Sequence, residues 1–508
     1  MSLLGTIIKK GLEWNQLLLE SPVDATPAQH QQLRKLLSTA KDTAIGKYYG
    51  YAELLEHDDL EAAFRERVPL VDYHQMHAQW WKQQEKYPDI TWPGHPDFFA
   101  LSSGTTGSKS KRIPITADFI QSMRDVGKSM VRALPDYHLP ETLYESEILM
   151  LSSSADLVDS KHGYRMGEIS GINVSNFPGW YDMFYRPGQE IAAIDDWDER
   201  CAAIVKEAPN WDIGAICGIP SWVLLLLRAI IKEHKLNTIH DLWPSLRVYA
   251  SGGVAFETFR SDFEEVTEKP LIIMDTYLAS EGFFAYTTSP DTMDMRLALE
   301  HGYYYEFIPF DERGVDDRGQ ILDNPECISI RDVELDQDYV LVVSSCSGAW
   351  RYIIGDTIRF TSIEPHNIVI TGRTKFFLNV VGSQLSEEKL DAGILAATES
   401  AGISVNEYMV AALQDDEGDY LHHWVVVTDD AVEDELAFAK MLDENLQGVN
   451  KNYAVARSKA LKRITTQIIS KQQYYDYLDQ QKKKGGQVKT PKVMTSTKME
   501  ELLEFLGK

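Results

Sequence analysis

Cysteine, positive charge and long apolar runs are all scarce in this chain of 508 residues. Its cysteines, Cys201, Cys217, Cys327 and Cys346, form no close pair such as Cys-x-x-Cys, which disfavours a disulfide framework or a zinc site. We therefore expect reduced cysteines, most of them in the core. The longest apolar run, 222–227, stops at an arginine and is too short to span a bilayer.

Acidic residues outnumber basic ones, with 77 Asp and Glu against 50 Lys and Arg and a formal net charge of -27. Nucleic acids and anionic membranes reward a basic surface, so we expect neither as a partner. The N-terminus also lacks the order of charge, apolar run and small residues that marks a signal peptide. We predict a soluble, cytoplasmic protein, and its length favours more than one domain.

A loop rich in glycine and hydroxyl groups follows the apolar run 98–101. It reads Ser102-Ser103-Gly104-Thr105-Thr106-Gly107, and Lys109, Lys111 and Arg112 come soon after it. Glycines let backbone N–H groups converge on one point, and the hydroxyls and cations complete a cradle for a polyphosphate. The Gly-Lys-Ser/Thr ending of a Walker loop is absent. A flexible linker explains this loop equally well, so the rest of the chain has to decide.

Strands and helices alternate in the middle of the chain. The segments 211–217, 246–250 and 271–274 read as strands, and helices begin near Pro220 and Glu257. This rhythm predicts an α/β fold with a mainly parallel sheet.

Two polar segments lie at the carboxyl ends of these strands, where ligands of such sheets bind. One is Ser251-Gly252-Gly253, and the other is Asp275–Gly282, which carries Thr276, Tyr277, Ser280 and Glu281. Each also has a simpler explanation, because Tyr277 can pack in the core and Glu281 can face solvent.

The pattern changes after Gly302, where aromatic and β-branched residues predict a β-rich subdomain attached to the sheet. Its expected strands cover 303–309, 338–344, 350–360 and 367–371. Asp356 follows Gly355 in the third of these strands, where it either serves a ligand or caps a turn.

Gly372-Arg373-Thr374-Lys375 ends the strand-rich region, and a smaller α+β pattern follows it. Ser386 is expected to cap a helix with two glutamates in its first turn, which suits the helix dipole. We predict a large N-terminal domain over 1–371 and a small C-terminal domain over 372–508, with a hinge near 372–375.

Two segments near the ends of the chain carry local signals. Thr26-Pro27-Ala28-Gln29 has the pattern of a capping box with proline at the first helical position. Near the C-terminus, 482–492 is a basic, glycine-containing loop that includes Lys489 and Lys492. Its simplest explanation is a solvated, mobile tail.

Taken together, four motifs resemble those of the adenylate-forming superfamily, which includes acyl-CoA synthetases and luciferases. They are Ser102–Lys111, Tyr277–Gly282, Trp350–Asp356 and Gly372–Lys375. The chain is most similar to the acyl-acid amido synthetase family, known from auxin-responsive enzymes of plants and from bacterial relatives. Smaller similarities support this, and they lie at 43–51, 68–73, 218–222, 304–309 and 485–492. The resemblance therefore covers nearly the whole chain, and it departs at Ser108, where the family usually has a small residue, often glycine.

The resemblance implies a role for each matching position. The loop, including Ser102, Ser103, Gly104, Thr105, Thr106, Lys109 and Lys111, would hold the ATP phosphates. Tyr277 would stack on adenine, with Gly252 and Gly253 allowing close approach, and Thr276 and Ser280 would lie near the α-phosphate. The remaining assignments are Glu281 for Mg²⁺, Asp356 for the ribose hydroxyls, Arg373 and Lys375 for the hinge, and Lys489 or Lys492 for delivery to the phosphates.

The family also implies a reaction. A small carboxylic acid would be activated by ATP as an acyl-adenylate, and an amine, expected to be an amino acid, would then displace AMP to form an amide. Two alternatives stay open, which are an acyl-CoA ligase using the same adenylate and a non-catalytic nucleotide-binding relative. The usual Pro-Lys-Thr-x-x-Gly-Lys ending of acyl-CoA ligases is missing, which favours the amide reaction. His162 and His301 are possible bases for the amine, without further support.

Overall fold

A computed structural model describes most of the chain. It covers residues 3–19, 23–102, 111–177, 179–252, 256–316, 319–374, 378, 383, 385–405, 407–415, 419–432, 434–459, 461–481 and 491–507. In these residues the strands form three sheets, which run in the orders β2-β1-β5-β4, β12-β13-β14-β15-β11-β10-β9-β8-β7-β3-β6 and β16-β17-β18. The arrangement confirms the predicted α/β class.

The large sheet is continuous but changes character at β9. Its parallel half contains β6 (Tyr185–Arg186), β3 (Glu147–Met150), β7 (Ile213–Gly218), β8 (Val248–Gly252) and β9 (Ile272–Ala279). Its antiparallel half contains β10 (Gly282–Thr287), β11 (Met295–Leu297), β15 (His366–Arg373), β14 (Tyr352–Ile363), β13 (Asp338–Ser345) and β12 (Tyr303–Pro309). The strand-rich region that we expected to be attached to the parallel sheet therefore extends that same sheet.

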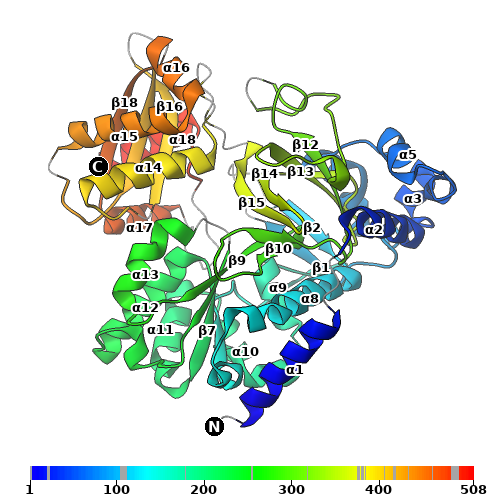
Figure 1. Ribbon diagram of the computed structural model, residues 1–508, viewed down its shortest axis with the longest axis horizontal. Helices are drawn as coiled ribbons and strands as arrows, with labels where there is room; N and C mark the ends of the chain where they lie inside the picture. The colour runs from blue at the N-terminus through cyan, green and yellow to red at the C-terminus, as the bar shows by residue number, and fades with distance from the viewer. Residues whose placement is uncertain are drawn as a thin grey trace.

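Helices cover the parallel half of the large sheet. These helices are α10 (Gln189–Ala192), α11 (Trp197–Glu207), α12 (Pro220–His234) and α13 (Arg260–Val266). Their apolar residues, such as Trp222 and Phe263, pack with Ile213, Ile216 and Tyr249 of the strands in one buried cluster. Figure 1 shows α11–α13 beside β7 and β9, below the C-terminal part of the chain. This packing supports the strand ends that carry the candidate site.

The antiparallel half packs against helices from the beginning of the chain. They are α2 (Ala25–Ala40), α3 (Ala44–Tyr49), α4 (Tyr51–Leu54), α5 (Leu60–Arg67), α6 (Tyr73–Met76), α7 (Lys82–Gln84), α8 (Ala117–Arg132) and α9 (Ile169–Ser175). A π-helix, His77–Trp81, links α6 and α7. The N-terminal helix α1 (Leu3–Leu19) lies along the lower edge of the molecule in Figure 1.

One helix start differs from the expected capping box. Helix α2 begins at Ala25, and the side chain of Asp24 caps it by accepting a hydrogen bond from the Thr26 amide at 3.3 Å. Asp is among the strongest N-cap residues, so it takes the position that we had given to Thr26. Gln29 is buried instead, where its amide donates to the carbonyls of Leu299 and Tyr303.

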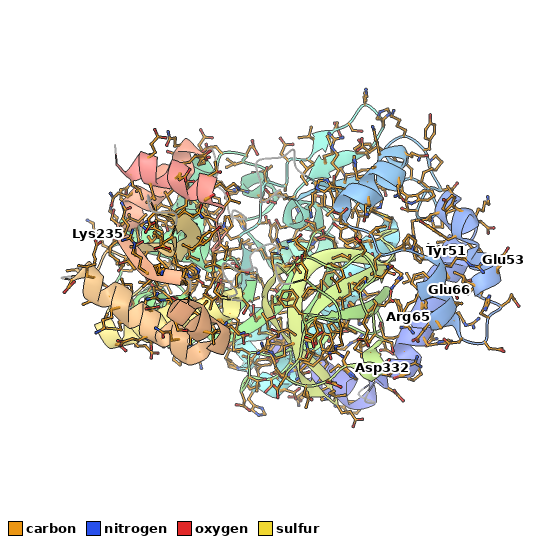
Figure 2. All side chains as sticks on the ribbon, turned by 90° about the horizontal axis from the view of Figure 1, so that it is seen from above. Tyr51, Glu53, Arg65, Glu66, Lys235 and Asp332 are labelled. Atoms are coloured by element: carbon orange, nitrogen blue, oxygen red, sulfur yellow. The ribbon has the colours of Figure 1, made fainter. Side chains whose placement is uncertain are left out.

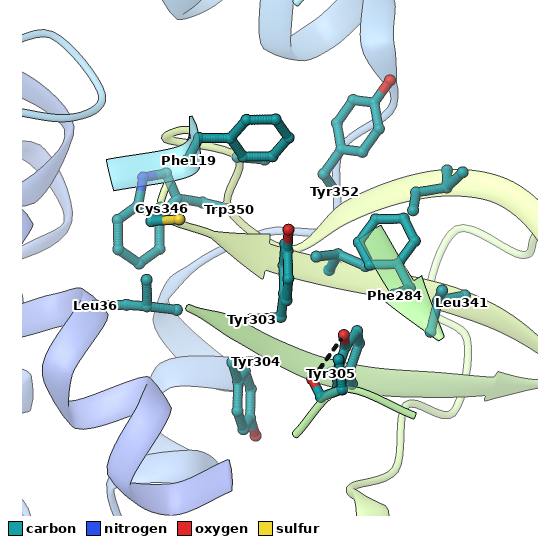
Figure 3. Close-up of a cluster of buried hydrophobic side chains, with 14 of the residues drawn as sticks. Leu36, Phe119, Phe284, Tyr303, Tyr304, Tyr305, Leu341, Cys346, Trp350 and Tyr352 are labelled. Carbon is teal, nitrogen blue, oxygen red and sulfur yellow. Dashed lines mark hydrogen bonds between the residues drawn. The ribbon is translucent and has the colours of Figure 1, made fainter. Parts of the chain in front are cut away.

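Large aromatic side chains fill the core of the antiparallel half. Tyr303, Tyr304 and Tyr305 are consecutive in β12 and almost fully buried, with the rings of Tyr303 and Tyr305 stacked at 6.1 Å. Figure 3 shows this tyrosine row together with Trp350 and Tyr352 from the neighbouring segment. Burial of this much aromatic surface stabilises this half of the sheet.

A second sheet carries the glycine loop. It contains β1 (Phe98–Ser102), β2 (Lys111–Ile115), β4 (Val158–Asp159) and β5 (Arg165–Gly167). Strands β1 and β2 pair antiparallel, and Ser102 lies opposite Lys111 at the end of the pairing. The segment 103–110 connects these two residues and lies outside the described part.

The C-terminal unit, defined here as residues 387–506, has its own sheet and core. Its elements are β16 (Glu407–Gln414), β17 (Tyr420–Val427), β18 (Leu461–Ile469), α14 (Glu387–Ala401), α15 (Glu435–Val449), α16 (Lys451–Lys459), α17 (Lys471–Gln480) and α18 (Ser496–Leu506). This unit lies above α12 and α13 and beside β14 and β15 in Figure 1. The predicted domain boundary falls just before the end of β15, and it stays a prediction.

The cysteines and the longest helices bear on two expectations from the composition. The cysteines are free, and Cys346 is buried while the others are half-buried. No helix in the described part is both long and apolar enough to cross a membrane. In a view turned by 90°, Figure 2 places Lys235, at the end of α12, on the opposite side of the molecule from Arg65 and Asp332.

Candidate functional site

A hydrogen bond between Tyr277 and Asp356 marks the centre of the candidate site. The Tyr277 hydroxyl of β9 donates to Asp356 Oδ2 of β14 at 2.7 Å. Strands β10, β11 and β15 stand between β9 and β14 in the sheet order, so the sheet must curl for these residues to meet. The curl brings two motifs together that are far apart in the sequence.

Arg373 completes this group from the next strand. It lies directly opposite Asp356 in the pairing of β14 with β15, and its Nε donates to Asp356 Oδ1. The Asp356 carboxylate raises the pKa of the Arg373 guanidinium, because the charged pair is more stable than the neutral base beside an anion. Asp356 is only 5% exposed, so Tyr277 and Arg373 hold its carboxylate in one orientation.

Glu281 lies in the turn between β9 and β10, beside this group. The Tyr352 hydroxyl donates to Glu281 Oε1 at 3.2 Å, and the carboxyl group is buried. Burial raises the pKa of Glu281, because desolvation disfavours the anion, while Lys111 acts in the opposite direction. A cation that arrives with a ligand would therefore stabilise the ionised form of this carboxyl group.

Lys111 approaches from the second sheet. Its Nζ lies 5.3 Å from the centre of the Tyr73 ring, and the Tyr73 hydroxyl accepts a hydrogen bond from the Arg112 amide at 2.8 Å. Arg112 in turn donates to Glu85 at 3.0 Å. These contacts fix the beginning of β2, and Lys111 is close enough to Glu281 to lower the pKa of its carboxyl group.

Gly252 and Thr276 face each other across β8 and β9. They are paired in the parallel register, and the Thr276 hydroxyl donates to the carbonyl of Ser251 at 2.8 Å. A Cβ atom on Gly252 would lie 2.8 Å from that hydroxyl, which is too close. A side chain at this position would therefore force the two strands to shift, whereas the close approach of adenine to Gly252 and Gly253 stays a prediction.

The structure brings some of the predicted residues together and leaves others untested. Lys111, Tyr277, Glu281, Asp356 and Arg373 form the cluster described above, Gly252 and Thr276 are paired in β8 and β9, and Ser280 lies in the turn after β9. Ser102 ends β1, but its side chain is outside the described part. The other predicted residues outside it are Ser103, Gly104, Thr105, Thr106, Lys109, Gly253, Lys375 and Lys489.

The surroundings of Tyr277 and of the two candidate histidines bear on their predicted roles. The Tyr277 ring is 4% exposed and packs edge-on against Phe284, so it offers little surface for a base to stack on. Its role toward adenine stays a prediction. His301 contacts Ser129 of α8 at 3.1 Å, and His162 is exposed on the loop after β4. The contact of His301 and the exposed position of His162 do not connect either histidine with the cluster.

Lys492 lies within the C-terminal unit. Its Nζ contacts both carboxylate oxygens of Asp391 in α14, at 2.6 and 2.7 Å. The Tyr408 hydroxyl donates to the same carboxylate at 2.6 Å. The predicted contact of Lys492 with a phosphate stays a prediction.

Charged contacts join the C-terminal unit to the rest of the chain. Arg359 of β14 donates to both oxygens of Glu388 in α14, at 3.0 and 2.9 Å. Lys471 of α17 lies 3.3 Å from Asp262 of α13, which also pairs with Arg228. A hollow lies between the two parts, and its lining includes Ser221, Arg228, Phe259, Glu407, Lys471 and Tyr475.

Several residues of the site were missed by the sequence reasoning. Tyr352 is within the quoted motif Trp350–Asp356 and received no role, although it holds Glu281. Tyr73 and Glu85 also received no role, although both contact Arg112, which follows the glycine loop in the sequence. Asp391 is one helical turn beyond Glu387, and this i, i+4 spacing in an acidic first turn was the available signal.

Magnesium was predicted at Glu281. Among the residues that the structure describes, no group of three or more His, Cys, Asp or Glu side chains could hold a metal ion. Mg²⁺ needs no such group, because it commonly binds through one or two carboxylates and the phosphates of its substrate. A buried glutamate that can supply one carboxylate fits that mode of binding, and the magnesium site stays a prediction.

The fold is that of the adenylate-forming ligases. A solved structure of GH3.15 acyl acid amido synthetase superposes with a TM-score of 0.77 at 16% sequence identity, covering 98% of this chain and 96% of that one. A structure of 2-hydroxyisobutyryl-CoA ligase in the postadenylation state, in complex with 2-HIB-AMP, gives 0.60 at 13% identity, covering 95% and 92%.

Family models match three consecutive parts of the chain. The GH3 family N-terminal domain matches residues 17–204, the central domain 296–373 and the C-terminal domain 388–498. The chain belongs to the GH3 family. One relative, the probable indole-3-acetic acid-amido synthetase GH3.11 of Oryza sativa subsp. japonica, is 25% identical over 264 residues, or 47% of this chain and 42% of the relative. The alignment thus spans less than half of that relative's length.

Proposed function

We propose that this protein is an ATP-dependent ligase that joins a small carboxylic acid to an amine, an amino acid, through an acyl-adenylate. The observation that carries the proposal is the cluster of Lys111 from β2 with Glu281, Asp356 and Arg373 from the large sheet. This cluster occurs in a chain with the adenylate-forming fold. Relatives of the GH3 family are named as amido synthetases, which supports an amine as acceptor.

Each part of the cluster suits one part of ATP. The glycine loop and Lys111 supply N–H groups, hydroxyls and positive charge for the phosphates. Asp356 accepts hydrogen bonds from Tyr277 and Arg373, and its carboxylate is the kind of acceptor that ribose hydroxyls would donate to. Glu281 would hold Mg²⁺, which supplies charge for the departing pyrophosphate when it is bound.

The chemistry needs alignment and charge rather than a protein nucleophile. A carboxylate oxygen of the acid attacks the α-phosphorus, the bond to the β-phosphate oxygen breaks, and pyrophosphate leaves. The amine then attacks the acyl carbon, loses a proton, and AMP leaves with the oxygen that joined it to the acid. The residues of the cluster orient the reactants and stabilise charge on phosphorus. We place this reaction in the cytoplasm.

Carboxylate-dependent exchange of pyrophosphate into ATP tests the proposal across a panel of small acids. Half of the reactions would also contain mixed amino acids, with products identified by mass spectrometry. Exchange with one class of acid and an amide mass would support the ligase. Failure of every acid in a protein that still binds ATP would contradict it and favour a non-catalytic nucleotide-binding protein.

A second candidate function is an acyl-CoA ligase. It is favoured by the fold shared with 2-hydroxyisobutyryl-CoA ligase. Exchange without any amide, followed by thioester formation when CoA is added, would select this function instead. Amide formation that is indifferent to CoA would exclude it.

A further inference from the structure

Arg200 of α11 is a buried cation, and in the part of the chain that the structure describes it forms no ion pair with a carboxylate. The residue is 4% exposed. Its Nη1 donates to the carbonyl of Ser152 at 3.2 Å, and the guanidinium lies 5.4 Å from the centre of the Trp197 ring, a cation–π arrangement. Its Nε is buried and has no hydrogen-bond partner among the described residues. Because a guanidinium has several N–H donors and stays charged, this place lacks both acceptors and negative charge.

A second donor without a partner lies beside Arg200. Tyr185 of β6 is fully buried, and its hydroxyl forms no hydrogen bond within the described ranges. Burial raises the pKa of Tyr185 to about 12, although Ser152 and Arg200 act in the opposite direction, so the hydroxyl stays protonated at neutral pH. Buried donors nearly always have an acceptor in folded proteins. Two such donors in one place therefore indicate a missing acceptor, which is either a water or a group of a ligand.

The carboxyl groups around Arg200 do not neutralise it. Burial lowers the pKa of Arg200, whereas Asp195 and Glu168 raise it less strongly. Both of these residues are exposed, and the described contacts include no ion pair between either of them and Arg200. An uncompensated buried charge is costly, so an anion that reaches Arg200 would be bound strongly.

The two donors lie at the carboxyl ends of the parallel strands, where ligands of such sheets bind. Ser152 follows β3, and the amide of Leu151 donates to the carbonyl of Cys217 in β7 at 2.8 Å. Strands β3, β7, β8 and β9 are neighbours in this order, and β9 carries Tyr277 of the proposed nucleotide site. Three strand spacings therefore place the guanidinium beside Ser152 roughly 14 Å from β9, along the same edge of the sheet.

We propose that Arg200, together with the hydroxyl of Tyr185, binds a second anionic group of the acid, so that the acid substrate is a dicarboxylic acid. This inference rests on the proposed function and names the class of acid that it uses. The carboxylate that reacts would lie at the nucleotide, and the other carboxylate would lie at the far end of the molecule, at Arg200. A carboxylate suits the guanidinium because it accepts two hydrogen bonds and carries the missing charge.

Matched pairs of acids test the proposal in pyrophosphate exchange. The panel contains α,ω-dicarboxylic acids of increasing length and the benzenedicarboxylic acids, each beside the monocarboxylic acid of the same skeleton. Exchange needs the acid and ATP but no amine, so it separates the acid from the carboxylate of an amino acid acceptor. The variants are Arg200→Met, Arg200→Lys and Tyr185→Phe. Arg186→Met is the matched control, because Arg186 follows Tyr185 in β6 but is paired with Glu147.

The wild type should prefer the dicarboxylic member of at least one pair. Arg200→Met should raise the KM for that acid about 10–100-fold and leave the KM for its monocarboxylic partner within about twofold, since only the charged hydrogen bonds are lost. Arg200→Lys should lie between Arg200→Met and the wild type, because it keeps the charge without the planar fork. Tyr185→Phe should raise the same KM about 2–10-fold, and Arg186→Met should leave the preference unchanged.

Three results would overturn the proposal. The first is a wild type without preference for the dicarboxylic acid in any pair, which is expected if a water fills the place beside Arg200. The second is an Arg200→Met variant that weakens exchange with both members of a pair by the same factor, as loss of a merely structural residue would. The third is an unchanged KM for the acid with a raised KM for the amino acid in amide formation, which would assign the second carboxylate to the acceptor.

Equilibrium dialysis measures the same contact without turnover. The preferred dicarboxylic acid, radiolabelled, is dialysed against the full-length protein in the presence of AMP. Its Kd should rise at least about tenfold in Arg200→Met and stay unchanged in Arg186→Met. Binding that depends on Arg200 without any exchange would count against the proposed function alone. Exchange in the wild type with an equal Kd in Arg200→Met would count against the role of Arg200 alone, so the two failures are distinguishable.

Discussion

Arg359 holds Glu388 through both carboxylate oxygens, at 3.0 and 2.9 Å, and so joins β14 of the large sheet to the first turn of α14. Arg359 also lies 2.8 Å from Asp338 on the neighbouring strand. A bidentate pair of this kind fixes direction as well as distance. It helps to set how the C-terminal unit is oriented on the rest of the chain.

A double-mutant cycle should measure this contact. We expect Arg359→Met, Glu388→Gln and the double variant to give a coupling free energy of about 1 kcal/mol in urea denaturation, since the pair is bidentate but partly exposed. The exposed pair of Lys440 and Glu444 is the control, with an expected coupling below about 0.5 kcal/mol. Equal coupling in both cycles would show that Arg359 and Glu388 do not hold the units together.

Glu407 should make the protein less stable as the pH rises. Burial raises its pKa from 4.5 to about 7, so between these values the folded state keeps a proton that the unfolded state has lost. The free energy of unfolding must then fall with rising pH in this window. Glu407→Gln should therefore stabilise by roughly 1–3 kcal/mol at about pH 8, and by less than about 1 kcal/mol at about pH 5.

Urea denaturation at both pH values checks the Glu407 prediction, with Glu444→Gln as the control, because Glu444 of α15 is exposed. A stabilisation of the same size at both pH values would mean that Glu407 does not titrate in this window.

His422 should change the free energy of unfolding with pH in the opposite direction, so that the protein loses stability as the pH falls. It is fully buried in β17, stacked on Tyr453 at 5.6 Å, and neither ring nitrogen has a hydrogen-bond partner among the described residues. Burial lowers its pKa from 6.5 to about 3, so the unfolded state binds a proton that the folded state does not. Stability is therefore lost as the pH falls below about 6.5.

The variant His422→Phe keeps the stacking and removes this proton linkage. Relative to the wild type, it should gain about 2 kcal/mol more at about pH 5 than at about pH 8. Exposed His57, changed to Gln, serves as the control, and the measurement is urea denaturation. A gain that does not depend on pH would reject a buried, neutral His422.

Replacing Asp356 should raise the KM for ATP and leave the KM for the acid unchanged. Asp356→Asn keeps the shape of the side chain but removes the charge that ribose hydroxyls would find, and hydrogen bonds to charged groups contribute about 1.5–3 kcal/mol. We expect the KM for ATP to rise about 10–100-fold in pyrophosphate exchange. Thr361→Ala on the same strand is the control. A normal KM for ATP with a raised KM for the acid would instead indicate that Asp356 contributes to binding of the acid.

Much of the sheet was predictable because its strands carry strong local patterns. The strand expected over 303–309 is β12 with the same bounds, since consecutive tyrosines are followed by a polar turn. By contrast, β18 (Leu461–Ile469) was missed. Its interior is largely polar, and it takes its place only by pairing with β17 in parallel, which no local pattern reveals.

The site was predictable as motifs but not as contacts. The hydrogen bond from Tyr277 to Asp356 depends on the curl of the sheet across β10, β11 and β15, a property of the whole fold. The contact of Lys492 with Asp391 spans 101 positions. The helix cap expected at Ser386 is correct in position, yet its hydroxyl has no partner among the described residues.

The most direct test of the central claim follows the oxygen of the acid. With a carboxylate labelled with ¹⁸O, formation of an acyl-adenylate must leave one labelled oxygen in AMP after the amine displaces it. We predict AMP that is heavier by about two mass units, with unlabelled pyrophosphate, because the bond to phosphorus forms from the acid. Label in inorganic phosphate, or AMP without label, would contradict an adenylate and with it the proposed function.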